Sequence, residues 1–207
     1  MNSLALTDGL LCAVSLYLVQ NRTLPVAFRL SAGLLATAAF LGVLRFSGLY
    51  PLPSWHQFFS MLGAVSAFPL LAVAIIWPNA LATRSTRFAW ILMCVAAVIG
   101  VVLVGAAQKR IYADGLALLS IIAILVTLLR AHQWLGALGS SIMLLALAGF
   151  ALKLSVGTLL LPGDLLHLGM VCGLLLLSGL PRWPAAGLLA TVATADGQPR
   201  HRQPEQG

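Results

Sequence analysis

Charged residues are scarce in this chain of 207 amino acids. Lysine and arginine together number 12 and aspartate and glutamate 5, or 8% of the sequence, whereas about a quarter of an average soluble domain is charged. Hydrophobic residues make up 60%, and the mean hydropathy is +1.00. A soluble domain of this size cannot bury so much apolar surface in one core. The composition therefore predicts an integral membrane protein, which we assign to a bacterial inner (plasma) membrane.

Cysteines and recognisable catalytic motifs are also rare. The three cysteines, Cys12, Cys94 and Cys172, all lie within long apolar runs. An odd number of cysteines outside the loops argues against a disulfide framework. The chain has no CxxC, HExxH, Walker or GxSxG motif, which excludes the redox, nucleotide-binding and hydrolase families that such motifs define.

Seven apolar runs have the length of about 20 residues that a helix needs to cross the hydrocarbon core. They cover residues 3–20, 24–46, 55–77, 88–107, 111–129, 134–152 and 164–180. Arg29 interrupts the second run, so its side chain must snorkel or find a partner. We predict an all-α bundle of seven transmembrane helices in residues 1–182, followed by a disordered cytoplasmic tail in residues 183–207, which is polar and contains proline.

The basic residues predict how this bundle is oriented. The side of the N-terminus has four of them, Arg45, Lys109, Arg110 and Lys153, and the other side has eight, Arg22, Arg29, Arg84, Arg87, Arg130, Arg182, Arg200 and Arg202. The excess favours the second side as cytoplasmic, with the N-terminus outside and the C-terminus inside. Because these residues lie in loops and at helix ends, we read them as orientation signals and lipid headgroup contacts, and we expect no nucleic-acid partner.

The few acidic residues are concentrated near one face of the membrane. Asp8, Asp114 and Asp164 lie near the starts of the first, fifth and seventh runs, His56 opens the third, and His167 follows Asp164 by three positions. Odd-numbered crossings all begin on the same side of the bilayer, here the outer side. An ionisable side chain at bilayer depth is costly and marks a functional site by default.

These side chains include metal-ligand types at suitable spacings. Asp164 and His167 share one helix face, and so do His56 and Ser60. A catalytic zinc ion uses three protein ligands, such as imidazole and carboxylate, plus water, and His56, Asp164 and His167 are candidates for those three. Asp8 or Asp114 would then serve as general base or as a further ligand.

A simpler interpretation explains the same acids without a metal. Aspartate is favoured at the start of a helix, where it caps the free amide groups. Cations on the same side, Arg45, Lys109, Arg110 and Lys153, are available as ion-pair partners. This interpretation fits His167 least well, because a histidine one turn inside a span needs a partner in place of water.

The polar positions also resemble those of the superfamily of seven-helix membrane hydrolases, which includes the alkaline ceramidases and the progestin and adiponectin receptors. The resemblance rests on seven helices, Asp8 in the first, an early histidine, and the D-x-x-H of residues 164–167 in the last. Members hold a zinc ion near one membrane face with one histidine from the second helix and two from an H-x-x-x-H in the last. Here His167 matches the second of those two, Gly163 stands at the first, and the S-x-x-x-H of the second helix is missing, because His56 precedes Ser60.

The resemblance implies a zinc-dependent hydrolase that acts on a lipid amide or ester, with Asp8, Asp114 and Ser60 as catalytic candidates. The residues leave other classes open. One is a non-enzymatic protein that binds a lipid or small ligand in an outward-facing polar pocket. A small transporter is another, for which Pro69 predicts a kink at depth, and a haem between His56 and His167 is more remote. Close helix contacts are expected in every case at Gly136, Gly139, Gly169 and Gly173.

Overall fold

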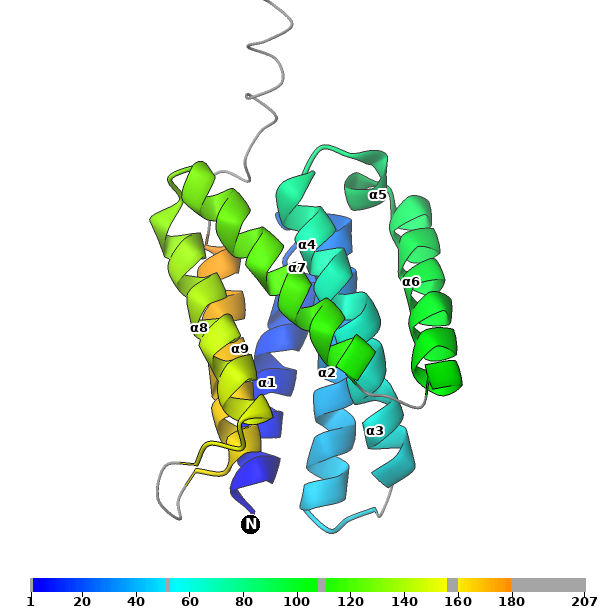
Figure 1. Ribbon diagram of the computed structural model, residues 1–207, viewed down its shortest axis with the longest axis vertical. Helices are drawn as coiled ribbons and strands as arrows, with labels where there is room; N and C mark the ends of the chain where they lie inside the picture. Colours follow the sequence, from blue (N-terminus) through cyan, green and yellow to red (C-terminus); the bar gives the residue numbers. More distant parts are fainter. Residues whose placement is uncertain (1, 51–52, 108–110, 156–159, 180–207) are drawn as a thin grey trace, which may run out of the picture.

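The computed structural model describes residues 2–50, 53–107, 111–155 and 160–179, which form helices and turns without a β-strand (Figure 1). The elements are α1 (Ser3–Gln20), α2 (Val26–Phe46), α3 (Pro53–Leu62), the π-helix η1 (Gly63–Ala67), α4 (Phe68–Ile76), α5 (Leu81–Arg84), α6 (Thr86–Ala107), α7 (Ile111–Arg130), α8 (Trp134–Ala151) and α9 (Pro162–Ser178). The predicted tail (183–207) and the basic residues Lys109, Arg110, Arg182, Arg200 and Arg202 lie outside the described residues.

Six helices in the described residues are long and apolar enough to cross a membrane. They are α1, α2, the continuous run α3–η1–α4, α6, α7 and α8, whereas α9 is apolar but has only 17 residues. Large apolar side chains cover the outside of the bundle, among them Val98 (63% exposed) and Leu145 (72%). Such an apolar exterior requires a lipid environment, which agrees with the predicted integral membrane protein.

The helix ends follow the predicted spans to within two residues, and the start of α2 is one that moves. This helix begins at Val26 rather than at residue 24. Asn21 Oδ1 accepts hydrogen bonds from the backbone N–H and the hydroxyl of Thr23 (3.1 and 2.6 Å), which holds a turn between α1 and α2. Pro25 then disfavours a helical conformation at the residue before it.

Arg29 finds a partner in the preceding helix. Its Nε donates to the backbone carbonyl oxygen of Val19 at 2.7 Å, near the end of α1. This contact satisfies one of the carbonyl groups that a helix leaves unpaired at its last turn.

The third span contains a local change of helix type next to Pro69. Proline has no N–H for the helical hydrogen bond, and its ring clashes with the carbonyl four residues earlier. The π-helix Gly63–Ala67 relieves this conflict just before the proline, as such bulges commonly do. Ser31 of α2 donates its hydroxyl to the carbonyl oxygen of Ala67 at 2.8 Å, so a side chain of a neighbouring helix supports the irregular stretch.

Glycine lets α8 and α9 approach closely, as predicted. A Cβ added at Gly139 would lie 3.0 Å from the backbone oxygen of Gly173, and one at Gly169 would overlap Ala146. The same helix α9 also packs against α1, which in turn packs against α2. The starts of α1 and α9 are therefore adjacent (Figure 1), although Ser3 and Pro162, which begin them, are 159 positions apart in the sequence.

Candidate functional site

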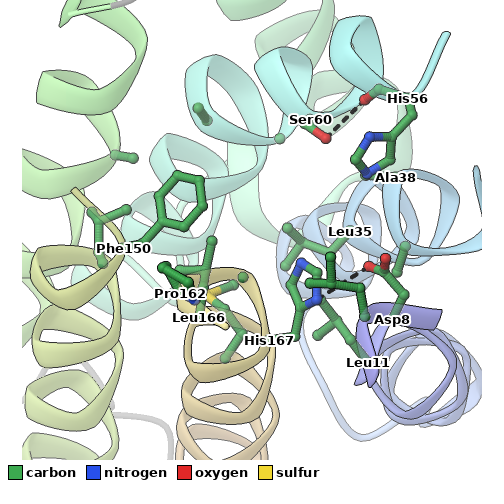
Figure 2. A pocket seen from close by; sticks show the side chains of 18 of the residues that line it. Asp8, Leu11, Leu35, Ala38, His56, Ser60, Phe150, Pro162, Leu166 and His167 are labelled. Atoms are coloured by element: carbon green, nitrogen blue, oxygen red, sulfur yellow. Dashed lines mark hydrogen bonds and ion pairs between the residues drawn. The ribbon is translucent and has the colours of Figure 1, made fainter. Parts of the chain in front are cut away.

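Most of the predicted polar residues line one cavity, of about 730 Å³, at the end of the bundle that contains the N-terminus. Asp8, His56, Ser60, Asp114 and His167 are among the lining residues. They come from α1, α3, α7 and α9, so the expectation that the odd-numbered spans bring their polar starts together is met. Figure 2 shows Asp8 with His167 on one side of the cavity and His56 with Ser60 on the other.

Asp164 is not among the residues that line the cavity, and it joins α9 to α1. It is fully buried. Its Oδ2 accepts hydrogen bonds from the Ser3 hydroxyl and from the backbone N–H of Leu161, both at 2.9 Å, and its Oδ1 accepts one from the Thr7 hydroxyl at 2.8 Å. Asp164 is the third residue of α9 and caps its first turn. The simpler interpretation, a helix cap, therefore describes this aspartate.

Asp8 is not a helix cap, and that alternative is wrong for this residue. The helix begins at Ser3 and is capped by Asn2, whose side chain accepts from the Leu4 N–H. Asp8 lies a turn further in, with 1% of its side chain exposed. Gly42 of α2 faces it, and a Cβ at that position would overlap the carboxyl group. The carboxyl group therefore occupies a slot that exists because residue 42 has no side chain.

Asp8 contacts His167 across the α1–α9 interface. Asp8 Oδ1 lies 3.3 Å from His167 Nδ1, and the Thr7 oxygen lies 3.4 Å from the same nitrogen (Figure 2). When Asp8 is ionised, Nδ1 donates to it, and Nε2 on the other edge of the ring keeps its lone pair. Nε2 has no hydrogen-bond partner among the residues that the structure describes. The pair can therefore present a basic nitrogen to a ligand in the cavity.

The opposite side of the cavity presents a different pair. Arg45 Nη1 lies 3.1 Å from His56 Nδ1. Arginine can only donate, so His56 accepts with Nδ1 and has its proton on Nε2. The His56 ring packs edge-on against Phe46 with 5.5 Å between ring centroids, and the Arg45 guanidinium lies 5.1 Å from the same ring.

Two residues singled out in the sequence are engaged with His56 on this side. Arg45 was expected to be available to the acids, but its hydrogen-bond partner is His56. Ser60 lines the cavity, yet its hydroxyl donates to the backbone oxygen of His56 at 2.7 Å, one turn earlier in its own helix. Serine commonly forms this bond to the carbonyl one turn earlier when it lies inside a helix.

The three predicted metal ligands do not gather around one point. No group of three His, Cys, Asp or Glu side chains placed to hold a metal ion occurs among the described residues. Both oxygens of Asp164 face α1 and the end of its own helix, and His56 Nδ1 faces Arg45. In this arrangement His56, Asp164 and His167 do not fit a single zinc ion.

Sequence reasoning gave no role to Thr7, Ser3 or Gly42, and treated Arg45 mainly as an orientation signal. Thr7 stands directly before Asp8, and a hydroxyl beside an acid inside an apolar run was a usable signal. No sequence signal pointed to Gly42, because its role depends on the helix that faces it.

Comparison with known proteins yields no relative. No family model, no curated protein sequence and no solved structure matches this chain. Inference about function therefore rests on the cavity itself.

Proposed function

We propose that the chain crosses the membrane seven times, with the N-terminus outside, in a bacterial inner membrane. The six long apolar helices and the apolar α9 support this number. With a rise of 1.5 Å per residue, α9 is about 26 Å long, and a bilayer adapts to so small a shortfall by local thinning. Reporter fusions in residues 78–87 and at the C-terminus should both report cytoplasm, and an external signal from either would reverse the orientation.

We propose that the cavity binds a lipid-like amphiphile. The observation that carries this proposal is the distribution of side chains in one space of about 730 Å³. Asp8, His167, His56 and Arg45 supply polar groups near the end of the bundle, whereas Leu11, Leu35, Phe68 and Met170 supply apolar walls. Ligand sites commonly have volumes of about 300–1,000 Å³ and combine apolar walls with a few polar groups. A headgroup would lie among the polar residues while its chain remains against the apolar ones.

Filling the cavity tests this proposal. Ala38 lines the cavity, whereas the preceding residue, Thr37, is exposed on the outer surface of α2. Ala38→Trp should remove an amphiphile that copurifies with the protein, and Thr37→Trp should keep it, as measured by mass spectrometry of lipid extracts normalised to protein. Equal retention by both variants, with unchanged thermal unfolding, would overturn the proposal.

The Asp8–His167 contact supports a second function, hydrolysis of a lipid ester or amide. In this proposal Nε2 of His167 takes a proton from a water molecule, and the resulting hydroxide attacks the carbonyl carbon. The protonated His167 then gives the proton to the leaving alcohol or amine as the C–O or C–N bond breaks. Asp8 orients the imidazole and stabilises its charged form, as a carboxylate does for a catalytic histidine.

Hydrolysis and binding are separable by one substitution. His167→Gln should lower product release from the hydrolysed lipid by about 100-fold or more, while the same variant still retains amphiphile. Undiminished turnover would exclude His167 as the base. Zinc remains a prediction from the resemblance, and elemental analysis of purified wild type and His167→Ala tests it directly.

A further inference from the structure

Arg45 is a cation whose contacts with the described residues include no carboxylate. It is half-buried, lies in the last turn of α2 and lines the cavity. Its contacts among the described residues are His56 Nδ1 at 3.1 Å and the Phe46 ring at 5.1 Å. Of the three described aspartates, Asp8 faces His167 and Asp164 faces Ser3 and Thr7, while Asp114 lines the same cavity from the first turn of α7.

None of these contacts neutralises the guanidinium. The imidazole of His56 must be uncharged to accept from Arg45. The C-terminus of α2 contributes about half of an elementary negative charge, and the Phe46 ring attracts the cation without carrying a net charge. A positive charge held at the edge of an apolar cavity is stabilised much more by an anion, because a buried unpaired charge is costly.

The cavity contains donors that can hold such an anion. The guanidinium has five N–H donors in a planar fork, of which the contact with His56 uses one. Gln57 and Lys153 line the same cavity. Lys153 has no ion-pair partner in the part of the chain that the structure describes. Arginine binds phosphate and carboxylate groups through two parallel hydrogen bonds.

We propose that the amphiphile in the cavity has an anionic headgroup, a phosphate or a carboxylate, which Arg45 binds in a fixed orientation set by His56. This inference rests on the proposed amphiphile site and adds the chemical class of its ligand. The anion lies on the α2–α3 side, and the rest of the headgroup extends toward Asp8 and His167.

The test compares three probes that share one oleoyl chain. They are 1-oleoyl lysophosphatidic acid, oleate and monooleoylglycerol, each titrated by calorimetry into the full-length protein in nonionic detergent. We expect the two anions to bind about tenfold or more tightly than the neutral lipid, since charge-assisted hydrogen bonds contribute about 1.5–3 kcal/mol. A further titration with inorganic phosphate distinguishes a lipid headgroup from a free anion, which would bind without a chain.

Variants then assign the preference to Arg45. Arg45→Gln should lower affinity for both anionic probes to that for monooleoylglycerol and leave the neutral lipid unchanged, whereas Arg45→Lys should recover part of the preference. Arg87→Gln removes the same charge from an exposed position at the opposite end of the bundle, and it should behave as wild type.

The outcomes separate the two proposals. If wild type binds monooleoylglycerol as tightly as the anions, or if Arg45→Gln keeps the preference, the anionic headgroup is wrong while the amphiphile site stands. If inorganic phosphate alone binds as tightly as lysophosphatidic acid, the ligand is a soluble anion. If none of the lipids binds, both proposals fall.

Discussion

Two histidines on opposite sides of the cavity each contact a charged side chain, and the two contacts differ in the direction of their hydrogen bonds. His167 meets an acid, Asp8, at 3.3 Å, and His56 meets a base, Arg45, at 3.1 Å. An ionised acid holds the proton of His167 on Nδ1, whereas a guanidinium forces the proton of His56 onto Nε2. The same residue type is therefore prepared as a proton acceptor on one side and as a donor on the other. The comparison shows that the partner, and not the histidine, determines the chemistry that each side can offer.

The side with His167 is also joined by the hydrogen bonds of Asp164 between α1 and α9, and removing them should have the largest effect on stability. Asp164→Ala would leave the donors of Ser3, Thr7 and Leu161 without their acceptor. Each lost bond costs about 1 kcal/mol, so we expect a loss of about 3 kcal/mol, or about 6 °C or more in Tm for a protein of this size. Thermal unfolding in detergent measures it. Asp164→Asn keeps one acceptor oxygen, so its Tm should lie between those of wild type and Asp164→Ala. A wild-type Tm for Asp164→Ala would contradict the account.

A smaller effect is expected where Gly42 makes room for Asp8. Gly42→Ala should destabilise the protein by about 1–3 kcal/mol, because the added methyl group displaces the carboxyl group. Gly33 offers a matched control on the same helix, since a Cβ there meets Val19 at an ordinary 3.7 Å. Gly33→Ala should therefore be neutral or stabilising. In an Asp8→Ala background the cost of Gly42→Ala should shrink, and strict additivity of the two substitutions would argue against the contact.

Ser60 should matter least among the residues near His56, although the sequence made it a catalytic candidate. Its hydroxyl is engaged with the His56 carbonyl at 2.7 Å. We expect Ser60→Ala to change the free energy of unfolding by no more than about 0.5 kcal/mol and to leave amphiphile binding and any hydrolysis intact. A tenfold loss of turnover with normal folding would restore a catalytic role.

A spectroscopic test reads the comparison directly in the wild-type protein, with variants needed only for assignment. Nitrogen-15 NMR of histidine-labelled protein in lipid nanodiscs distinguishes the two neutral tautomers. We expect a protonated Nε2 at His56 and a protonated Nδ1 at His167, with His56→Gln and His167→Gln used to assign the signals. The same tautomer at both residues would remove the distinction between the two sides.

The sequence predicts the helices well because hydropathy is a local property. The runs at 3–20 and 111–129 correspond to α1 (Ser3–Gln20) and α7 (Ile111–Arg130), and the shared membrane side of Asp8, His56 and His167 follows from counting crossings. The break in the third span also has a local cause, Pro69, although its form as a π-helix depends on support from α2.

Side-chain partners could not be predicted in the same way, because they depend on which helices become neighbours and how each is rotated. Asp164 bonds to Ser3, which lies 161 positions earlier. Gly42 shapes the site through the space it leaves, which only the facing Asp8 reveals. The expected set of three metal ligands assumed that side chains near one membrane face also point to one centre, and depth in the membrane does not determine that direction.

Photo-crosslinking tests the central claim, an amphiphile in the cavity, most directly. Oleate with a diazirine in its chain is added to the protein in nanodiscs, and the labelled residues are mapped by mass spectrometry. The account predicts labels on Leu35, Phe68 and Met170, which line the cavity, that unlabelled oleate competes away and that Ala38→Trp abolishes. Labels confined to outward-facing residues such as Val98 on α6, with no competition, would show that the lipid contacts only the outer surface and would contradict the claim.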